Sequence, residues 1–235
     1  EYSLIERTVE LDLLPMAFTK MGSMWVWIDP QARTLVLDTG SQARADEVVS
    51  APVRGSAARV PIRRIVCVGR NYEAHATELG AAVDRAAPFY FTKAAADYVP
   101  SGATVPYPPG TQNYHYEMEL VVAVGKAGFR IAEGQALDHV FGYACGLDMT
   151  RRDLQLAARE QRRPWDLGKD FEQSAVLSGI VPAAQCGHPG KGAIELRVNG
   201  QTKQSSDLAL LIHGVPALLA HLSFFFNDAA TTEIY

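Results

Sequence analysis

Two glutamates, Glu117 and Glu119, lie one residue apart near the start of the stretch 114–125. The valine-rich run that follows them predicts a β-strand, in which residues two apart face the same side. On a solvent-facing strand such a pair is ordinary. On a strand that enters a core, two neighbouring carboxylates repel each other unless a cation lies between them, and oxygen ligands suit Mg²⁺, Mn²⁺ or Ca²⁺ better than zinc.

A third carboxylate, Asp148, follows the next apolar run, residues 140–147. We expect a strand to give way to a helix at this point, which leaves the side chain free to converge with Glu117 and Glu119. The three carboxylates together predict a site for a divalent cation.

A histidine and a glutamate lie on a short predicted helix, residues 72–79, which follows a buried strand predicted for residues 64–68. His75 and Glu78 are three residues apart, so they share one face of that helix within reach of a hydrogen bond. A lone histidine on a short helix is more often a partly exposed surface residue. A histidine that a carboxylate orients can instead act as a general base.

A second polar helix is predicted from Thr150 to about residue 161, with Thr150 and Asp153 resembling a capping box. Arg152 and Gln155 share one face of this helix. By default Arg152 would be a solvated surface charge, and it gains a role only if the helix begins near the carboxylates.

Lys169 ends a predicted loop, residues 164–169, and it too would by default be a solvated charge. If the loop packs back on the strand ends, its ammonium group returns to the neighbourhood of Asp148. Aromatic residues near this loop are expected to belong to the core rather than to contact a substrate: Phe89, Phe91 and Trp165.

Three further elements have clear signals in the sequence. Residues 25–29 and 34–38 predict a small hairpin. Residues 194–198 alternate as a strand does and are followed by an Asn-Gly turn, and residues 215–222 predict the last helix, with a proline in its first turn.

The bulk composition excludes several classes of protein. The chain has 235 residues, a net charge of −4 and a pI near 5.9, so it offers no positive field to attract nucleic acid. No apolar run reaches the roughly 20 residues that a membrane-spanning helix needs. We therefore expect a cytoplasmic protein that acts on a small molecule.

Five motifs, in a fixed order, carry a resemblance to a known family: Val68 to Tyr72 with His75 and Glu78, Phe91 to Lys93, His115 to Glu119, Leu147 to Asp153 with Gln155, and Arg163 to Trp165 with Lys169. On these motifs, residues 62–223 resemble the fumarylacetoacetate hydrolase family. The resemblance implies an α+β fold, a rolled mixed β-sheet assembly that is usually a homodimer.

The resemblance also implies roles for individual residues. Glu117, Glu119 and Asp148 would be ligands of Mg²⁺ or Mn²⁺. The catalytic residues would be His75 and Glu78, as a dyad on a lid helix, and Lys169, and the substrate-binding residues would be Arg70, Arg152 and Gln155.

The activity that the resemblance implies is metal-dependent hydrolysis of a carbon–carbon bond in an acylpyruvate. The arrangement is most similar to family members of aromatic catabolism that cleave fumarylpyruvate to fumarate and pyruvate. Two alternatives stay open: decarboxylation of a β-keto acid such as oxaloacetate, which the same chemistry supports, and a degenerate module that only binds a metal or an acid.

The chain also departs from the family pattern. The segment Lys169 to Glu172 ends in glutamate where the family commonly has aspartate. Residues 224–235 are unlike the family's C-terminal strands and are expected to be a non-native tail. The expected organisation is thus an N-terminal extension with a small hairpin at 1–61, an incomplete catalytic domain at 62–223, and the tail.

Overall fold

The computed structural model describes residues 25–29, 34–38, 49–72, 85–225 and 232–234. The chain divides into two compact units, residues 1–47 and 48–235. Residues 48–61, which the sequence analysis grouped with the N-terminal part, therefore belong to the second unit. They form a short hairpin of β3 (Ser50–Pro52) and β4 (Arg59–Pro61).

The first unit contains the predicted hairpin strands, β1 (Trp25–Asp29) and β2 (Thr34–Asp38). They pair antiparallel along their whole length, from Trp25 opposite Asp38 to Asp29 opposite Thr34. The prediction of these two strands is confirmed.

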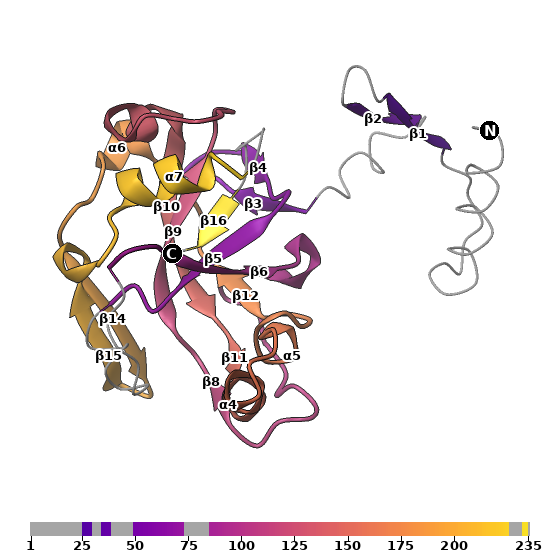
Figure 1. Cartoon of the computed structure of the whole chain (residues 1–235), viewed down its shortest axis with the longest axis vertical. Helices are drawn as coiled ribbons and strands as arrows, with labels where there is room; N and C mark the ends of the chain where they lie inside the picture. The colour runs from indigo at the N-terminus through magenta and orange to yellow at the C-terminus, as the bar shows by residue number, and fades with distance from the viewer. Residues whose placement is uncertain (1–24, 30–33, 39–48, 73–84, 226–231, 235) are drawn as a thin grey trace. The chain divides into compact units, whose positions relative to one another are not determined.

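The second unit is built on a mixed sheet in which the strands follow the order β6, β5, β16, β9, β10, β12, β7, with β13 also paired to β10 (Figure 1). Two of its pairings are parallel, β12 with β7 and β16 with β5, and the rest are antiparallel. The bounds of these strands are β5 Ile65–Gly69, β6 Phe89–Lys93, β7 Tyr98–Pro100, β9 Met118–Val124, β10 Val140–Asp148, β12 Ala175–Leu177, β13 Val181–Pro182 and β16 Thr232–Ile234.

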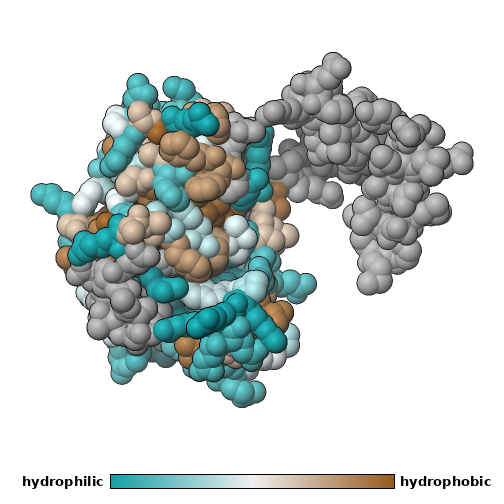
Figure 2. Space-filling view, viewed as in Figure 1, coloured by the Kyte–Doolittle hydropathy of each residue, from teal (hydrophilic) through white to brown (hydrophobic). Residues whose placement is uncertain are grey.

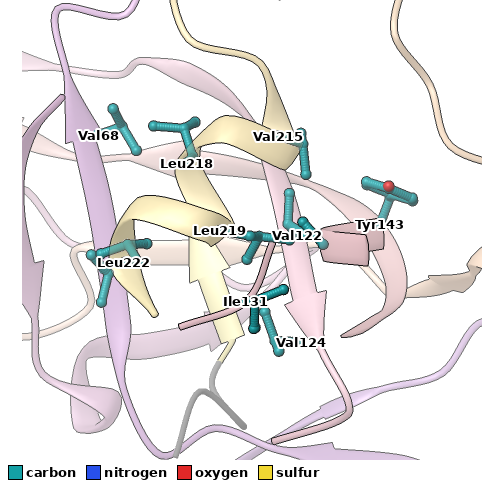
Figure 3. Packing of buried hydrophobic residues seen from close by; sticks show 11 residues of the cluster. Val68, Val122, Val124, Ile131, Tyr143, Val215, Leu218, Leu219 and Leu222 are labelled. Carbon is teal, nitrogen blue, oxygen red and sulfur yellow. The ribbon is translucent and has the colours of Figure 1, made fainter. Parts of the chain in front are cut away.

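Side chains of the central strands point alternately to the two faces of the sheet, and each face has its own hydrophobic core. Val122 and Val124 of β9 face a cluster formed with helix α7 (Val215–Leu222), whose Leu218 and Leu219 are almost completely buried (Figure 3). Residues 121 and 123 point to the opposite face, where they pack in the second cluster with Ile65, Ala175 and Leu177. Both faces of the sheet are thus covered, as expected of valine-rich strands without a polar face.

The remaining elements lie around the sheet. The predicted strand at 194–198 is β14 (Ala193–Val198), which forms a hairpin with β15 (Gln201–Asp207). Asn199 and Gly200 between them both have positive φ, 52° and 78°, as the two-residue turn requires. The others are η1 (Ala95–Asp97), η2 (Glu133–His139), η3 (Leu208–Leu210), α6 (Ala183–Cys186), β8 (Tyr114–His115), β11 (Thr150–Arg151), α4 (Arg152–Glu160) and α5 (Asp166–Lys169).

Figure 2 shows hydrophobic residues gathered near the middle of one face of the second unit, with hydrophilic residues over the end that carries α4. No helix among the described residues is both long and apolar enough to cross a membrane. The α+β class and the mixed sheet agree with the fold expected from the sequence.

Two local predictions were wrong. The strand expected from residue 114 onward is broken into β8 and β9, with Tyr116 and Glu117 between them. Thr150 does not cap a helix either: it lies in β11, and the Asp153 carboxylate accepts hydrogen bonds from Thr111 and the amide of Gln112 instead.

Candidate active site

Strand pairing between β9 and β10 brings the predicted carboxylates together. Glu119 lies opposite Gly146, and two residues away the Asp148 amide donates a hydrogen bond of 2.9 Å to the Glu117 carbonyl. The antiparallel register thus places Asp148 beside Glu117 at the end of both strands, as the sequence predicted. A one-residue slip would send one partner to the opposite face.

Lys169 links two of the three carboxylates. Its Nζ donates to Glu117 Oε2 and to Asp148 Oδ2, each at 2.6 Å, and to Thr150 Oγ1 at 2.7 Å. The side chain is only 2% exposed, because α5 carries it back onto the ends of β10 and β11. The conditional expectation for the loop is confirmed, since Lys169 does return to Asp148.

Arg152, the first residue of α4, contacts a carboxylate rather than solvent. One of its guanidinium nitrogens donates to Glu117 Oε1 and another to Gln155 Oε1. Both Arg152 and Gln155 are buried. In the structure Arg152 holds Glu117 and Gln155 holds Arg152, and the substrate contact that the resemblance implies for both stays a prediction.

Lys93 is a site residue to which the sequence analysis gave no role. It ends β6, is 2% exposed, and places Nζ 3.0 Å from Asp148 Oδ1. Nζ also donates to the carbonyls of Met149 and Lys169. The available signal was a lysine at the end of the aromatic-rich run 89–92. A charge in such a position must either reach solvent or find a buried partner.

Charges at this site act on one another strongly. Burial lowers the pKa of Lys169, but the attraction of Asp148 and Glu117 outweighs burial and raises that pKa above the ordinary value. Burial also raises the pKa of Glu119 well above its ordinary value, and repulsion from Glu117 and Asp148 raises it further. Glu119 is therefore the carboxylate for which an added positive charge would be most favourable.

The donor set fits Mg²⁺ or Mn²⁺ in atom type and charge, because it consists of three carboxylates, one in β9, one just before it and one at the end of β10. Asp148 Oδ1 is buried, and although it accepts no hydrogen bond of good geometry it is paired with the Lys93 ammonium group at 3.0 Å. Among the described residues no three His, Cys, Asp or Glu side chains are grouped so that they could hold an ion as they lie. The ammonium group of Lys169 bridges Glu117 and Asp148.

The predicted dyad, His75 and Glu78, lies outside the described residues. Arg70 is described: it follows β5 in a left-handed conformation with φ of 60°. Its guanidinium carbon lies 5.1 Å from the ring centroid of Phe89 and 5.7 Å from that of Trp165.

A cavity of about 760 Å³ lies beside β6, and Lys169 is one of its lining residues. Phe89, Phe91 and Trp165 line it as well, and Phe89 is 40% exposed. Phe91 also packs against the second core cluster, as expected, whereas the expectation that Phe89 belongs to the core was wrong. The rings contact one another in a tilted arrangement, with 4.9 Å between the centroids of Phe89 and Trp165, and form a wall of the cavity.

Asp170, the residue after Lys169, has a side-chain hydrogen bond with the buried Asp97. Asp170 also accepts a hydrogen bond of 2.7 Å from the amide of Ala94, next to Lys93. Burial and the neighbouring Asp170 raise the pKa of Asp97 to about 7. This acidic pair therefore lies between the chain segments that carry the two buried lysines.

This arrangement of carboxylates and lysines has known counterparts. Residues 64–230 match the family model described as fumarylacetoacetate hydrolase, C-terminal. The chain belongs to the fumarylacetoacetate hydrolase family. A second family model, described as putative exonuclease RdgC, matches residues 2–77, about a third of the chain, and carries no argument about the site.

Individual members of this family are similar to the chain over most of its length. Fumarylpyruvate hydrolase of Ralstonia sp is 57% identical over 147 residues, which are 63% of this chain and 76% of the relative. The human mitochondrial oxaloacetate tautomerase is 38% identical over 161 residues, 68% of this chain and 72% of the relative.

A solved family structure also matches the fold. The crystal structure of fumarylpyruvate hydrolase from Pseudomonas aeruginosa in complex with Mn²⁺ and pyruvate superposes with a TM-score of 0.74 at 48% identity. The match covers 79% of this chain and 81% of that one. The family and the fold class expected from the sequence are both confirmed.

Proposed function

We propose that this protein is a metal-dependent hydrolase that cleaves the carbon–carbon bond of an acylpyruvate, with fumarylpyruvate giving fumarate and pyruvate. The observation that carries the proposal is the meeting of Glu117, Glu119, Asp148 and Lys169 beside a cavity. The 57% identity to a fumarylpyruvate hydrolase supports the choice of substrate.

A divalent ion fits the three carboxylates of Glu117, Glu119 and Asp148. When bound, Mg²⁺ or Mn²⁺ supplies Lewis-acid polarisation of the pyruvoyl oxygens and favours the enolate that leaves. Arg152 donates a hydrogen bond to Glu117 and a second one to Gln155, so Gln155 holds the guanidinium group that orients this ligand.

The hydrolytic step needs a base and a proton donor. His75, oriented by Glu78, takes a proton from water, whose oxygen bonds to the acyl carbonyl carbon. The bond from that carbon to the pyruvate methylene then breaks, and its electron pair goes to the methylene carbon. The ammonium of Lys169 stabilises this developing charge and gives a proton to the methylene carbon. The proton that His75 took from water then restores the ammonium group, so both residues return to their starting states.

Pyruvate formation tests the proposal directly. Purified protein with Mn²⁺ or Mg²⁺ is given fumarylpyruvate, and pyruvate is measured through lactate dehydrogenase and NADH. We expect metal-dependent pyruvate and fumarate in equal amounts, with loss of turnover after treatment with a chelator. Absence of pyruvate at every metal concentration would refute the hydrolase.

Oxaloacetate is the second candidate substrate, favoured by the 38% identity to an oxaloacetate tautomerase. The same assay with oxaloacetate separates the possibilities. Decarboxylation gives pyruvate and CO₂, tautomerisation changes only the enol absorbance, and hydrolysis of an acylpyruvate gives two acids. We expect fumarylpyruvate to have the highest kcat/KM.

The proposed substrate is a small molecule, and the assembly and location of the enzyme stay predictions. A homodimer is expected, and light scattering coupled to size exclusion tests it. A cytoplasmic location is expected as well, and cell fractionation tests that. The non-native origin of residues 224–235 is also untested, although residues 232–234 pair with both β5 and β9.

A further inference from the structure

The cavity beside Lys169 has a strongly basic lining. Its cationic residues include Arg70, Arg162 and Arg163, whereas Asp166 is the one acidic residue among those that line it. Among the described residues, no ion pair involves the guanidinium group of Arg162 or Arg163. The lining is therefore suited to an anion that carries more negative charge than a single carboxylate supplies.

Arg162 adopts a backbone conformation that side chains other than glycine rarely take. Its φ is 56°, and it ends α4 with hydrogen bonds from Arg162 N to Arg159 O at 3.0 Å and from Arg163 N to Ala158 O at 2.8 Å. Helices that end with this pair of bonds usually have glycine at the left-handed position. The chain thus accepts backbone strain that places an arginine on the cavity.

Arg70, which also lines the cavity, shows the same combination. Its φ is 60°, and its guanidinium group lies over the rings of Phe89 and Trp165. Two of the described non-glycine residues with positive φ therefore line one cavity. Phe89, Phe91 and Trp165, whose rings are tilted against one another, form an apolar part of the same lining, which suits the carbon chain of an acyl group.

Lys169 fixes the direction in which a substrate lies. Its ammonium group contacts Glu117 and Asp148, the carboxylates at which the pyruvoyl end reacts in the proposed function. The acyl group would then occupy the rest of the cavity, whose lining includes Phe91 and Trp165. Arg162 and Arg163 line the same cavity and are therefore the cations available to the far end of a linear acyl group.

We propose that Arg162 and Arg163 form an acyl-end subsite that binds a carboxylate at the far end of the acyl group, with the aromatic wall holding the chain between. The enzyme would then select acylpyruvates whose acyl group is itself an acid, such as fumarylpyruvate, over those that end in a methyl group, such as acetylpyruvate. This inference rests on the proposed function for the identity of the reacting end.

The first experiment compares two substrates in three variants. Arg162→Gly removes the guanidinium group and also the backbone strain, and Arg163→Met removes the second charge while keeping the aliphatic stem. We expect each change to lower kcat/KM for fumarylpyruvate by about tenfold or more and to leave acetylpyruvate within about twofold. Arg130→Gly is the matched control, because Arg130 also has positive φ, 52°, but does not line the cavity.

Stability separates a binding role from a structural one. Arg162→Gly should melt at or above the wild-type temperature, because glycine adopts the left-handed conformation without strain. Loss of fumarylpyruvate turnover with a retained melting temperature supports the subsite. Equal losses on both substrates, or no loss on fumarylpyruvate, overturn it.

A binding measurement keeps this test independent of the proposed reaction. Fumarate and crotonate have nearly the same shape but two and one carboxylates respectively, and their affinities for the Mn²⁺-loaded protein can be measured by calorimetry. We expect wild type to prefer fumarate and the Arg162→Gly, Arg163→Met double variant to lose the preference. If no acylpyruvate is turned over but this pattern holds, the proposed function fails and the subsite stands. Equal affinities in wild type refute the subsite whatever the turnover.

Discussion

Glu119 differs from the other two carboxylates in its surroundings. Glu117 and Asp148 each contact a buried cation, whereas no ion pair among the described residues includes Glu119. Its charge is opposed by burial and by its two acidic neighbours, which raise its pKa. We infer that Glu119 gains most from a metal ion and loses most when none is bound.

The first prediction follows from this difference. Glu119→Gln removes one negative charge, so Mn²⁺ affinity should fall by at least about tenfold, which corresponds to about 1.4 kcal/mol. The metal-free variant should melt at or above the wild-type temperature, because repulsion from Glu117 and Asp148 is gone. Calorimetry and thermal melts measure the two effects.

Glu195→Gln, on the exposed face of β14, is the control and should leave metal affinity unchanged. An unchanged affinity in Glu119→Gln itself would remove this residue from the metal site. A large loss of stability without metal would instead show that its charge is already compensated.

The second prediction concerns His75. His75→Ala should lower kcat by about 10²-fold or more, as is typical when a general base is lost, while Mn²⁺ affinity stays at the wild-type value. Steady-state kinetics and calorimetry on the same preparations measure both quantities. His139→Ala, at the end of η2, is the control. Full turnover in His75→Ala would exclude it as the base.

At the scale of elements, the pair of carboxyl groups of Asp97 and Asp170 makes the free energy of unfolding depend on pH. The pKa of Asp97 in the folded protein is about 7, above its ordinary value of 3.8, because of burial and Asp170. Between these two values the folded state keeps a proton that the unfolded state has released. The contribution of Asp97 is thus fully present below the lower value and is lost as pH rises toward 7.

The third prediction is that Asp97→Asn flattens this dependence. The free energy of unfolding of the variant should fall less than that of wild type between pH 4 and 7, and should exceed the wild-type value at pH 8. Urea unfolding at a series of pH values measures it. Asp138→Asn, at an exposed position of η2, is the control and should keep the wild-type dependence of the free energy of unfolding on pH. The same wild-type dependence in Asp97→Asn would show that Asp97 and Asp170 do not hold the proton.

The fourth prediction concerns the contact between β10 and β13. A Cβ atom at Gly142 would lie 2.3 Å from the carbonyl oxygen of Val181, a backbone atom that cannot turn away. Gly142→Ala should therefore destabilise the protein by about 1–3 kcal/mol in chemical unfolding. Gly134→Ala meets no atom within 4 Å and should be neutral or slightly stabilising. Equal stability of the two variants would contradict this account.

At the scale of the molecule, the sequence predicted what depends on local pattern. The alternation of Val121 to Val124 defines the two faces of β9, and the apolar run before Asp148 places that carboxylate at the end of β10. The helix expected at residues 215–222 has those bounds as α7. Each of these features is encoded within about ten residues of the chain.

Features that depend on distant contacts could not be predicted in this way. Lys93 is buried because carbonyl groups 56 and 76 residues away accept its hydrogen bonds, and no local period signals that. The pairing of β16 with β5 and β9 likewise follows from the sheet and not from its own three residues. Arg162 was overlooked because an arginine at a helix end is normally a solvated charge.

The place of β9 and β10 inside the sheet has a consequence for how the site is lost. Both strands have hydrogen-bonded neighbours on each side, β16 and β12 respectively, while β6 and β7 are at the edges. Local opening of a sheet begins where partners are few, so amide hydrogens of the interior strands should exchange with solvent only on global unfolding.

The fifth prediction is that amides of residues 119–124 and 142–148 exchange more slowly than those of β6 and β7 when followed by mass spectrometry. Faster exchange in the interior would contradict it. Two of the three carboxylates would then belong to the last part of the molecule to open, and activity would end together with the fold.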